Sequence, residues 1–222
     1  MKRLIIARHG NTFSAGETPT RIGARTDLPL VEEERGRAVG KYLKDKNLLP
    51  DRVYAAPLKR TMQTAALAVE EMNLDRPIIP AKDFLEIDYG PDENKTEDEV
   101  MMRLGKTAAP AGATDEEILA EGKKIIDLWN EKAEVPNGWN VNPESICNAW
   151  KDFAASIGDG ETVLLVSSNG VIRFAPCLTE DYDAFCRDND IKVATGGVCI
   201  LEENGGKWTA TEWNVKAFKL YR

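Results

Sequence analysis

Short apolar runs alternate with longer amphipathic stretches along the chain. The apolar runs are too short for helices and rich in β-branched and aromatic residues, so each predicts a β-strand. They occupy residues 4–7, 51–57, 78–80 and 162–167. The run at 162–167 is the most apolar, which is typical of a central strand in a parallel sheet, whereas 78–80 is predicted to be a short edge strand.

The longer stretches carry apolar residues at helical spacing. They predict helices at residues 32–43, 58–72, 114–129 and 142–153. Thr114 is followed by Asp-Glu-Glu, a sequence typical of a helix start. Helices of this kind bury one face, so they are expected to pack on the predicted sheet or on each other.

Near the carboxyl end, apolar stretches at 197–201 and 207–213 flank Asn204-Gly205-Gly206, which predicts a β-hairpin. Strands alternating with helices indicate an α/β fold with a mostly parallel central sheet. We therefore expect a single domain over residues 1–222. Between the parts of the predicted sheet, the composition becomes charged and typical of helices. This indicates a helical insertion at about 91–150, packed over one edge of the sheet.

Composition and charge narrow the function classes. Hydrophobic residues make up 42% and charged residues 30% of the chain, which is ordinary for a globular protein. The formal net charge of -8 argues against nucleic acid as a partner, so a small anion would have to be drawn by a local cluster of arginines. No apolar stretch is long enough for a signal peptide or a membrane span, so we expect a cytoplasmic protein without a membrane partner.

The cysteines fall at no metal-ligand spacing and have no histidine near them, so we interpret them as reduced packing thiols. They are Cys147, Cys177, Cys186 and Cys199. The chain contains one histidine, His9. Any histidine chemistry must therefore be done by His9 alone.

His9 directly follows the first predicted strand, in the sequence Arg8-His9-Gly10. Gly10 allows the backbone to approach a ligand closely. Asn11 and Thr12 are typical helix-start residues, so we expect a helix to follow, with its free N–H groups available to an anion.

Two other strand ends carry polar residues. Arg60 lies in the first turn of the helix predicted at 58–72, and Ser168 and Asn169 follow the strand at 162–167. Because ligands in open α/β sheets bind at the carboxyl ends of the strands, we expect these residues to meet Arg8 and His9 there. Arginines, an imidazole and helix amino ends together suit a phosphoryl group.

Four ordered motifs resemble the histidine phosphatase superfamily, the phosphoglycerate-mutase-like enzymes. The resemblance runs from residue 3 to about 90 and resumes from about 160 to 215. It implies a phosphoglycerate-mutase-like, three-layer α/β fold, with helices on both faces of the sheet. The motifs are Arg8-His9-Gly10-Asn11-Thr12, Arg21 with Asp27-Leu28-Pro29-Leu30, residues 56–65, and Leu85-Glu86-Ile87-Asp88-Tyr89-Gly90.

The resemblance implies that His9 is a nucleophile and Glu86 the proton donor. A neutral imidazole would attack phosphorus in line and form a phosphohistidine, which water then hydrolyses. Arg8 and Arg60 would disfavour the protonated imidazole and hold the phosphoryl oxygens. Phosphate near Glu86 would raise the pKa of its carboxyl group, which could then protonate the leaving group. The scheme needs no metal and no cofactor.

The chain departs from the family at its last motif, where Ser-His-Gly-Gly is replaced by Ser167-Ser168-Asn169-Gly170. Ser168 therefore stands where the family has a second histidine. Losing one preorganised donor typically costs about 10²- to 10³-fold in rate, which leaves most of an acceleration of 10⁶-fold or more, in round terms. We interpret the chain as a phosphoric monoester hydrolase that is weakened or specialised. A catalytically inactive phospho-ligand binder and a phosphoglycerate-type mutase stay open as alternatives.

The expected ligand is a small phosphorylated substrate or inorganic phosphate. Asn11, Thr12, Ser168 and Asn169 are candidate phosphate-binding residues, and Arg21 and Arg25 are each either ligand contacts or solvated loop residues. Trp129, Trp139 and Trp150 are expected to anchor the insertion, unless one of them roofs the pocket. The sequence leaves the identity of the substrate and any homo-oligomer open.

Overall fold

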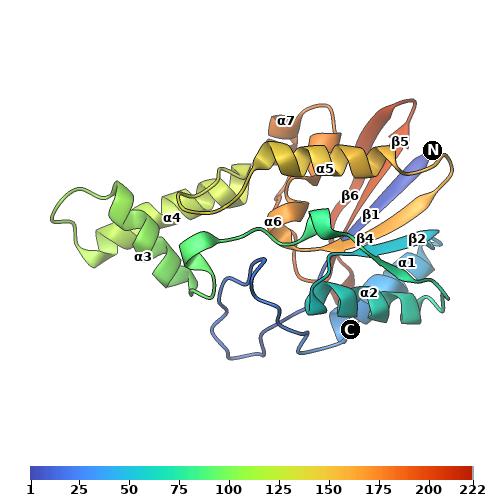
Figure 1. Cartoon of the computed structure of the whole chain (residues 1–222), viewed down its shortest axis with the longest axis horizontal. Coiled ribbons are helices and arrows are strands. Elements are labelled where there is room, and N and C mark those ends of the chain that lie inside the picture. Colours follow the sequence, from blue (N-terminus) through green and yellow to red (C-terminus); the bar gives the residue numbers. More distant parts are fainter. Residues whose placement is uncertain (222) are drawn as a thin grey trace.

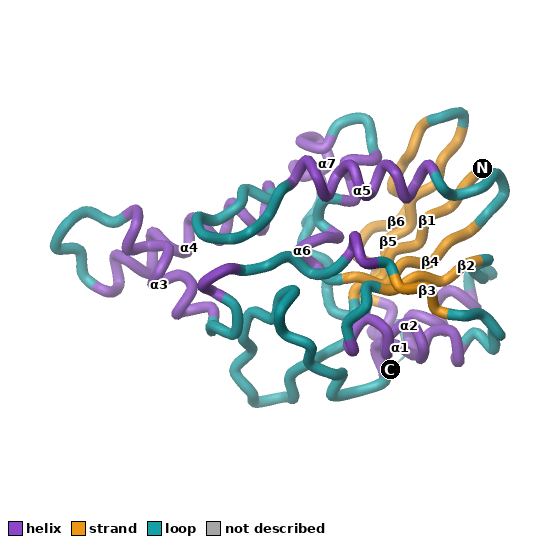
Figure 2. Tube along the Cα trace, in the orientation of Figure 1, coloured by secondary structure: helices purple, strands orange, loops and turns teal. Residues whose placement is uncertain are grey.

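The computed structural model describes residues 1–221, which form six β-strands and seven α-helices joined by turns, loops and single 3₁₀ turns (Figures 1 and 2). The strands are β1 (Lys2–Arg8), β2 (Arg52–Ala55), β3 (Ile78–Pro80), β4 (Thr162–Ser167), β5 (Gly197–Asn204) and β6 (Lys207–Lys216). The helices are α1 (Glu34–Asp45), α2 (Lys59–Glu71), α3 (Glu97–Ala108), α4 (Asp115–Lys132), α5 (Pro143–Ala155), α6 (Asn169–Ile172) and α7 (Tyr182–Asp188). Every strand and helix expected from the apolar pattern is present.

All six strands lie in one sheet in the order β3-β2-β4-β1-β5-β6. The pairs β3–β2, β2–β4 and β4–β1 are parallel, whereas β5 runs antiparallel to β1 and to β6. This confirms a mostly parallel sheet with β4 inside it and β3 at one edge. The predicted hairpin is also present: Gly205 and Gly206 form its turn with φ of +60° and +86°, values that glycine adopts without strain.

The two faces of the sheet bury separate cores, because successive side chains of a strand point to opposite sides. In β1, Leu4 and Ile6 pack with the core under α5, whereas Ile5 and Ala7 pack with the core under α1 and α2. Figure 1 shows α5 on one side of the sheet and α1 and α2 on the other. The chain therefore has the three-layer arrangement that the resemblance implies.

The prediction of a helix after Asn11 and Thr12 is wrong, since residues 9–33 contain no helix. The Asn11 side chain accepts a hydrogen bond from the Thr195 hydroxyl at 2.7 Å instead of capping a helix. Farther along, the Glu93 carboxylate accepts hydrogen bonds from the backbone N–H groups of Gly23 and Arg25 at 3.0 and 3.2 Å. These tertiary contacts fix the segment as an ordered loop and outweigh its local helix-start signal.

The helical insertion is not packed over a sheet edge, contrary to expectation. Figure 1 shows α3 and α4 projecting from the body as an arm. We use "the arm" for α3, α4 and the turn between them. Thr96 and Thr114 cap the two helices with reciprocal side-chain hydrogen bonds, so the helix start predicted at Thr114 is confirmed. The arm stays away from the sheet because α3 and α4 bury their apolar faces mainly against each other.

α5 belongs to the layer that covers the sheet rather than to the arm. Its amino end is capped by the Asn142 side chain, which accepts a hydrogen bond from the Ser145 N–H at 3.0 Å. Trp150, on its buried face, is fully buried and donates from Nε1 to the Val171 carbonyl at 3.1 Å. None of the helices formed by residues 1–221 is both long and apolar enough to cross a membrane.

Two glycines let the helices of the arm approach closely. A Cβ atom on Gly105 would stand 1.8 Å from the Ile118 carbonyl oxygen, and one on Gly122 would stand 1.8 Å from the Met101 carbonyl oxygen. Both atoms belong to backbone, which cannot rotate away. The crossing of α3 and α4 therefore requires glycine at both positions.

We predict that Gly105→Ala and Gly122→Ala each destabilise the protein by about 1–3 kcal/mol, the usual cost of overpacking. Alanine favours a helix by about 1 kcal/mol over glycine, so helix propensity alone gives the opposite sign. Urea unfolding followed by circular dichroism measures the difference. Gly158→Ala is the control, because its Cβ would meet no atom closer than 3.4 Å. Unchanged or increased stability of both arm variants would contradict the close crossing.

Candidate active site

The pairing of β1 with β4 places His9 at the carboxyl edge of the sheet. Arg8 lies opposite Ser167 in this pair, and the backbone N–H of His9 continues the ladder by donating to the Ser167 carbonyl at 3.1 Å. On the other side, the N–H of Gly196 donates to the His9 carbonyl at 3.1 Å. Residues from two distant parts of the chain therefore fix the backbone of His9.

The imidazole of His9 is also held in one orientation. Its Nδ1 lies 2.7 Å from the Gly10 carbonyl oxygen and donates to it, which leaves Nε2 with a free lone pair. The N–H of Gly10 donates to the Thr64 hydroxyl at 3.0 Å, and that hydroxyl donates to the Arg60 carbonyl at 2.7 Å. The first turns of α2 thus support the histidine loop.

Burial and two arginines keep the His9 ring neutral. The side chain is 4% exposed. Burial lowers the pKa of His9 well below 6.5, and the charges of Arg8 and Arg60 lower it further. This is the electrostatic effect expected from the sequence.

Arg60 is fully buried beside His9. Its guanidinium donates to the Thr26 carbonyl at 2.6 Å and to the Gly23 carbonyl at 3.3 Å, while Nε has no partner within residues 1–221. Arg60 is not among the residues that line the cavity described below. It acts on His9 in this structure through its charge.

Glu86 lies against the start of α6, where its carboxylate accepts hydrogen bonds from the N–H groups of Ile87 at 2.9 Å and Gly170 at 3.3 Å. Burial raises the pKa of Glu86, and the charge of Arg60 partly offsets this. The sequence argument attributed a raised pKa to bound phosphate, but burial already raises it without a ligand. A Cβ at position 170 would stand 2.3 Å from the Glu86 carboxylate, so glycine is needed there.

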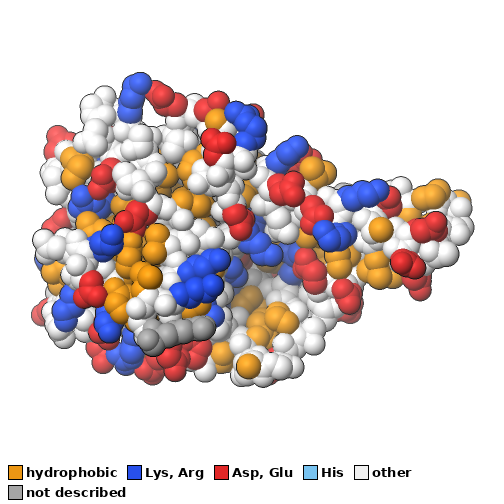
Figure 3. Space-filling model, turned by 180° about the vertical axis from the view of Figure 1, so that it is seen from behind, with side chains coloured by type: hydrophobic (Ala, Val, Ile, Leu, Met, Phe, Trp, Pro, Cys, Tyr) orange, Lys and Arg blue, Asp and Glu red, His pale blue; other side chains and the backbone are white. Residues whose placement is uncertain are grey.

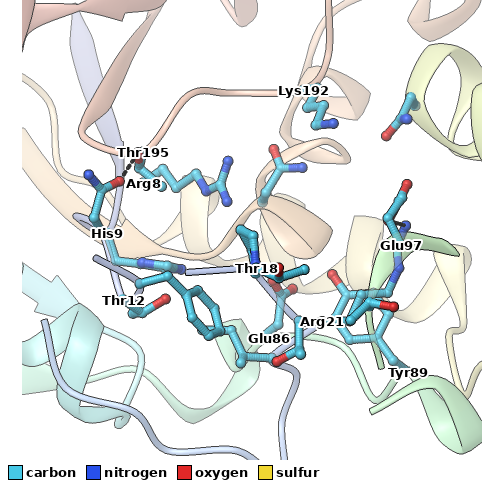
Figure 4. Close-up of a pocket in the computed structure, with 18 of the residues that line it drawn as sticks. Arg8, His9, Thr12, Thr18, Arg21, Glu86, Tyr89, Glu97, Lys192 and Thr195 are labelled. Atoms are coloured by element: carbon cyan, nitrogen blue, oxygen red, sulfur yellow. Dashed lines mark hydrogen bonds and ion pairs between the residues drawn. The ribbon is translucent and has the colours of Figure 1, made fainter. Parts of the chain in front are cut away.

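A cavity of about 760 Å³ opens between the body and the arm. Figure 3 shows the molecule hollowed at this junction, with Lys and Arg side chains along one rim. Figure 4 shows the His9 ring and the Arg8 guanidinium reaching into the cavity, with Glu86 below them and Arg21 and Tyr89 farther along. The candidate site residues that line the cavity are Arg8, His9, Asn11, Thr12, Arg21, Glu86 and Asn169.

The two loop arginines that the sequence left undecided have different positions. Arg21 lines the cavity, lies 4.9 Å from the Trp139 ring centroid and forms an ion pair with Glu97 at 2.6 Å. Arg25 pairs with Asp88 at 3.1 Å and is outside the cavity lining. Only Arg21 is therefore placed to contact a ligand.

Ser168 and Asn169 follow β4. The Ser168 hydroxyl is fully buried and has no hydrogen-bond partner within residues 1–221, and the residue lies behind the cavity lining. Asn169 lines the cavity and accepts a hydrogen bond from the Val193 N–H at 2.9 Å. Neither residue supplies a positive charge.

Sequence reasoning did not single out Arg173 and Lys192, which also line the cavity, and it left open which tryptophan would do so. Arg173 follows Asn169 by one helical turn, a spacing that places both on the same side of the short helix. Trp129 is thus the tryptophan that contributes to the cavity wall, while Trp150 lies on the buried face of α5. Lys192 lies in a loop, and no local pattern marks it.

A profile of the histidine phosphatase superfamily, branch 1, matches residues 4–216. The chain belongs to the histidine phosphatase superfamily. This confirms the resemblance carried by the four sequence motifs, and the match spans the arm as well as the sheet.

Two curated relatives match part of this histidine phosphatase chain. The uncharacterized phosphatase PhoE of Bacillus subtilis is 32% identical over 120 residues, which cover 53% of this chain and 59% of that protein. A 2,3-bisphosphoglycerate-dependent phosphoglycerate mutase of Bifidobacterium longum is 32% identical over 108 residues, or 46% of this chain and 42% of that protein. The chain thus spans about half the length of the curated relatives it matches.

Solved structures share the fold. A phosphoglycerate mutase from Bacillus anthracis aligns with a TM-score of 0.73 at 21% identity, covering 98% of this chain and 94% of that one. A mycobacterial glucosyl-3-phosphoglycerate phosphatase aligns with a TM-score of 0.69 at 17% identity, covering 96% and 99%. A phosphoserine phosphatase from Entamoeba histolytica reaches 0.69 at 19%, covering 96% and 97%. At these identities the likeness establishes the phosphoglycerate-mutase-like fold.

We predict that His9 stays neutral to well below pH 6.5 in the folded protein. Its folded pKa lies below the unfolded value, so stability should decline as pH falls from about 6.5 toward the folded pKa, because only the unfolded chain takes up that proton. NMR titration of the imidazole measures this directly, since His9 is the sole histidine.

Arg8→Gln should raise the pKa of His9, because it removes a neighbouring positive charge. Arg25→Gln is the matched control and should leave the titration unchanged. A His9 titration near 6.5 in the unaltered protein would contradict the buried, cation-flanked site.

Proposed function

We propose that the protein is a phosphatase that hydrolyses a small phosphate monoester through a phosphohistidine at His9. The observation that carries the proposal is the neutral His9 ring, with Nδ1 bound to the Gly10 carbonyl and Nε2 free at the cavity. A neutral imidazole nitrogen is a competent nucleophile at phosphorus, and a buried one is not lost to protonation at neutral pH.

Arg8 and Arg60 hold the phosphoryl group in this proposal. Arg8 lines the cavity, and its Nη1 donates to the Val193 carbonyl at 2.6 Å, which leaves Nε without a partner within residues 1–221. Arg60 would exchange a carbonyl contact for a phosphoryl oxygen. Two guanidinium groups would offset the charge on the equatorial oxygens as the bond to the leaving group breaks.

Glu86 supplies the proton in this proposal. Phosphoryl transfer to His9 Nε2 breaks the bond between phosphorus and the ester oxygen, and the departing oxygen takes the proton of the Glu86 carboxyl. The resulting carboxylate then accepts a proton from the water that attacks the phosphohistidine, which releases inorganic phosphate and restores the acid. Asn11, Thr12, Arg21 and Asn169 are proposed to position the substrate from the cavity wall, and Ser168 to provide a neutral donor behind it.

The second candidate is a phospho-ligand binder without turnover. The buried Ser168 hydroxyl favours it, because no cation replaces the family's second histidine there. A mutase is disfavoured on the same ground, since it must keep a long-lived phosphoenzyme and hand the group back. The surviving nucleophile, arginines and acid favour the phosphatase.

We predict that the protein releases inorganic phosphate from nitrophenyl phosphate and that His9→Ala lowers the rate to background, because no other imidazole is present. Acid-labile phosphate should be trapped on the unaltered protein by rapid quenching and be absent from the variant. Equal rates for both would refute the proposal. Thermal stabilisation by inorganic phosphate without turnover of any ester would establish the binder instead.

We predict that Glu86→Gln lowers kcat/KM by a factor that depends on the leaving group of the ester. An alkyl phosphate should lose about 10²- to 10⁴-fold in kcat/KM, the usual contribution of a general acid. Nitrophenyl phosphate should lose far less, because its phenolate departs without a proton. kcat/KM is the proper measure, since it reports the steps through the first irreversible phosphoryl transfer and not the later hydrolysis.

Asp98→Asn is the control for this prediction. Asp98 is an exposed carboxylate at the cavity mouth, so its loss should change kcat/KM for both ester classes by the same factor. Equal losses on alkyl and aryl esters in Glu86→Gln would show that Glu86 is not the proton donor.

A further inference from the structure

The cavity holds more positive charge than one phosphoryl group needs. Arg8, Arg21, Arg173 and Lys192 line it and Arg60 lies behind it, whereas the lining carboxylates are those of Glu86, Glu97 and Asp98. With Glu86 protonated as the acid, the surplus is three positive charges among the described residues. A phosphate monoester dianion neutralises two of them.

Arg173 is the cation of this cavity whose charge the protein itself offsets least. It is 1% exposed, and burial lowers its pKa to about 10, so it keeps its charge at neutral pH. Its Nε donates to the Asn169 carbonyl at 3.3 Å, and Nη1 donates to the Trp129 carbonyl. Both acceptors are neutral, and within residues 1–221 Arg173 forms no ion pair. A buried charge without a counter-charge is costly, which favours an anionic ligand beside it.

Rigid contacts on the cavity wall fix the direction of the guanidinium. Its central carbon lies 3.8 Å from the Trp129 ring centroid, so the group stacks on the indole. Stacking and two carbonyl contacts leave Nη2 as the donor with no protein acceptor in the described chain. The Arg173 guanidinium is therefore held in one orientation before a ligand binds, unlike that of a mobile surface arginine.

Lys192 brings a second cation to the same cavity, and its ammonium forms no ion pair within residues 1–221. Figure 4 shows its ammonium across the cavity from His9 and Thr12. The loop that carries it is fixed at the next residue, because the Val193 carbonyl accepts from Arg8 at 2.6 Å and the Val193 N–H donates to Asn169. Arg173 donates to the backbone carbonyl of the same Asn169 whose side chain accepts from Val193, the residue after Lys192. Asn169 therefore links the positions of Lys192 and Arg173.

We infer that Arg173 and Lys192 form a second anion-binding subsite, and that the substrate is a phosphate ester carrying one further anionic group, a carboxylate by the charge count. The inference rests on the proposed function, since it describes the far end of the same substrate. The cavity volume of about 760 Å³ agrees with it. Cavities of roughly 300–1,000 Å³ enclose whole small molecules, so the space exceeds what a phosphoryl group fills.

The test compares three esters that share a four-carbon spacer: the terminal phosphate ester of hydroxybutyrate, butyl phosphate and butanediol bisphosphate. We expect kcat/KM for the carboxylate ester to exceed that for butyl phosphate by about tenfold or more, one charge-assisted contact being enough for that factor. A higher value for the bisphosphate than for the carboxylate would assign the subsite to a second phosphate and overturn the carboxylate.

Lys192→Gln and Lys192→Glu form a graded series at a loop residue that makes only backbone hydrogen bonds within the described chain. The preference for the carboxylate ester, measured as the ratio of its kcat/KM to that of butyl phosphate, should fall in the first variant and be abolished or reversed in the second. Arg173→Gln should remove the preference as well, provided that its melting curve shows a folded protein. Lys106→Gln, an exposed lysine of the arm outside the cavity lining, is the control for net charge.

Binding separates this inference from the proposed function. In His9→Ala, which cannot form a phosphohistidine, the carboxylate ester should raise the melting temperature more than butyl phosphate does, and Lys192→Glu in that background should remove the difference. This preference in binding, together with no turnover of any ester by the unaltered protein, would uphold the subsite and refute the phosphatase. Equal stabilisation by the two esters, or a preference that Lys192→Glu leaves intact, would refute the subsite.

Discussion

The parallel pairing of β1 with β4 is the constraint on which the rest of the structure depends. It buries both strands on both faces and sets Arg8 opposite Ser167. A slip by one residue would exchange the two cores and turn the side chains of β1 to the wrong faces. Because the apolar side chains on both sides forbid that slip, His9 and Ser168 necessarily emerge at neighbouring points of one edge.

Charge is the second determinant of the site, and it is distributed unevenly. The protein is acidic overall, with a net charge of -8, yet arginines and a lysine gather around one cavity. Most of these cations are bound by carbonyl oxygens instead of carboxylates, as Arg60 is by Gly23 and Thr26. Carbonyl dipoles orient a guanidinium without cancelling its charge, so the positive potential remains available to a ligand while the side chains stay ordered.

Short-range patterns predicted the sheet and the core well. The apolar strands and the glycine turn at Gly205 depend on local rules that packing reinforces. Arg8 and His9 lie at the carboxyl end of β1 as predicted, and Glu86, which was identified by its motif alone, lines the same cavity. The patterns did not predict local structure or position correctly where contacts with residues far along the chain determine them. Asn11 does not begin a helix because Thr195, far along the chain, engages its side chain. Lys192 carries no local signal, since only the folding of its loop brings it to the cavity.

The arm was also predicted as helical but misplaced, because helical periodicity shows that a face is buried without showing what buries it. The close crossing at Gly105 and Gly122 makes α3 and α4 each other's partners. Trp129, near the end of α4, and Glu97, at the start of α3, contribute to the cavity wall, while His9 and Glu86 stand on other segments. The arm therefore supplies part of the cavity wall, and His9 and Glu86 reach the same cavity from other segments of the chain. Substitutions on the arm would therefore change the shape of this wall without moving His9, whose backbone is held by Ser167 of β4 and by Gly196.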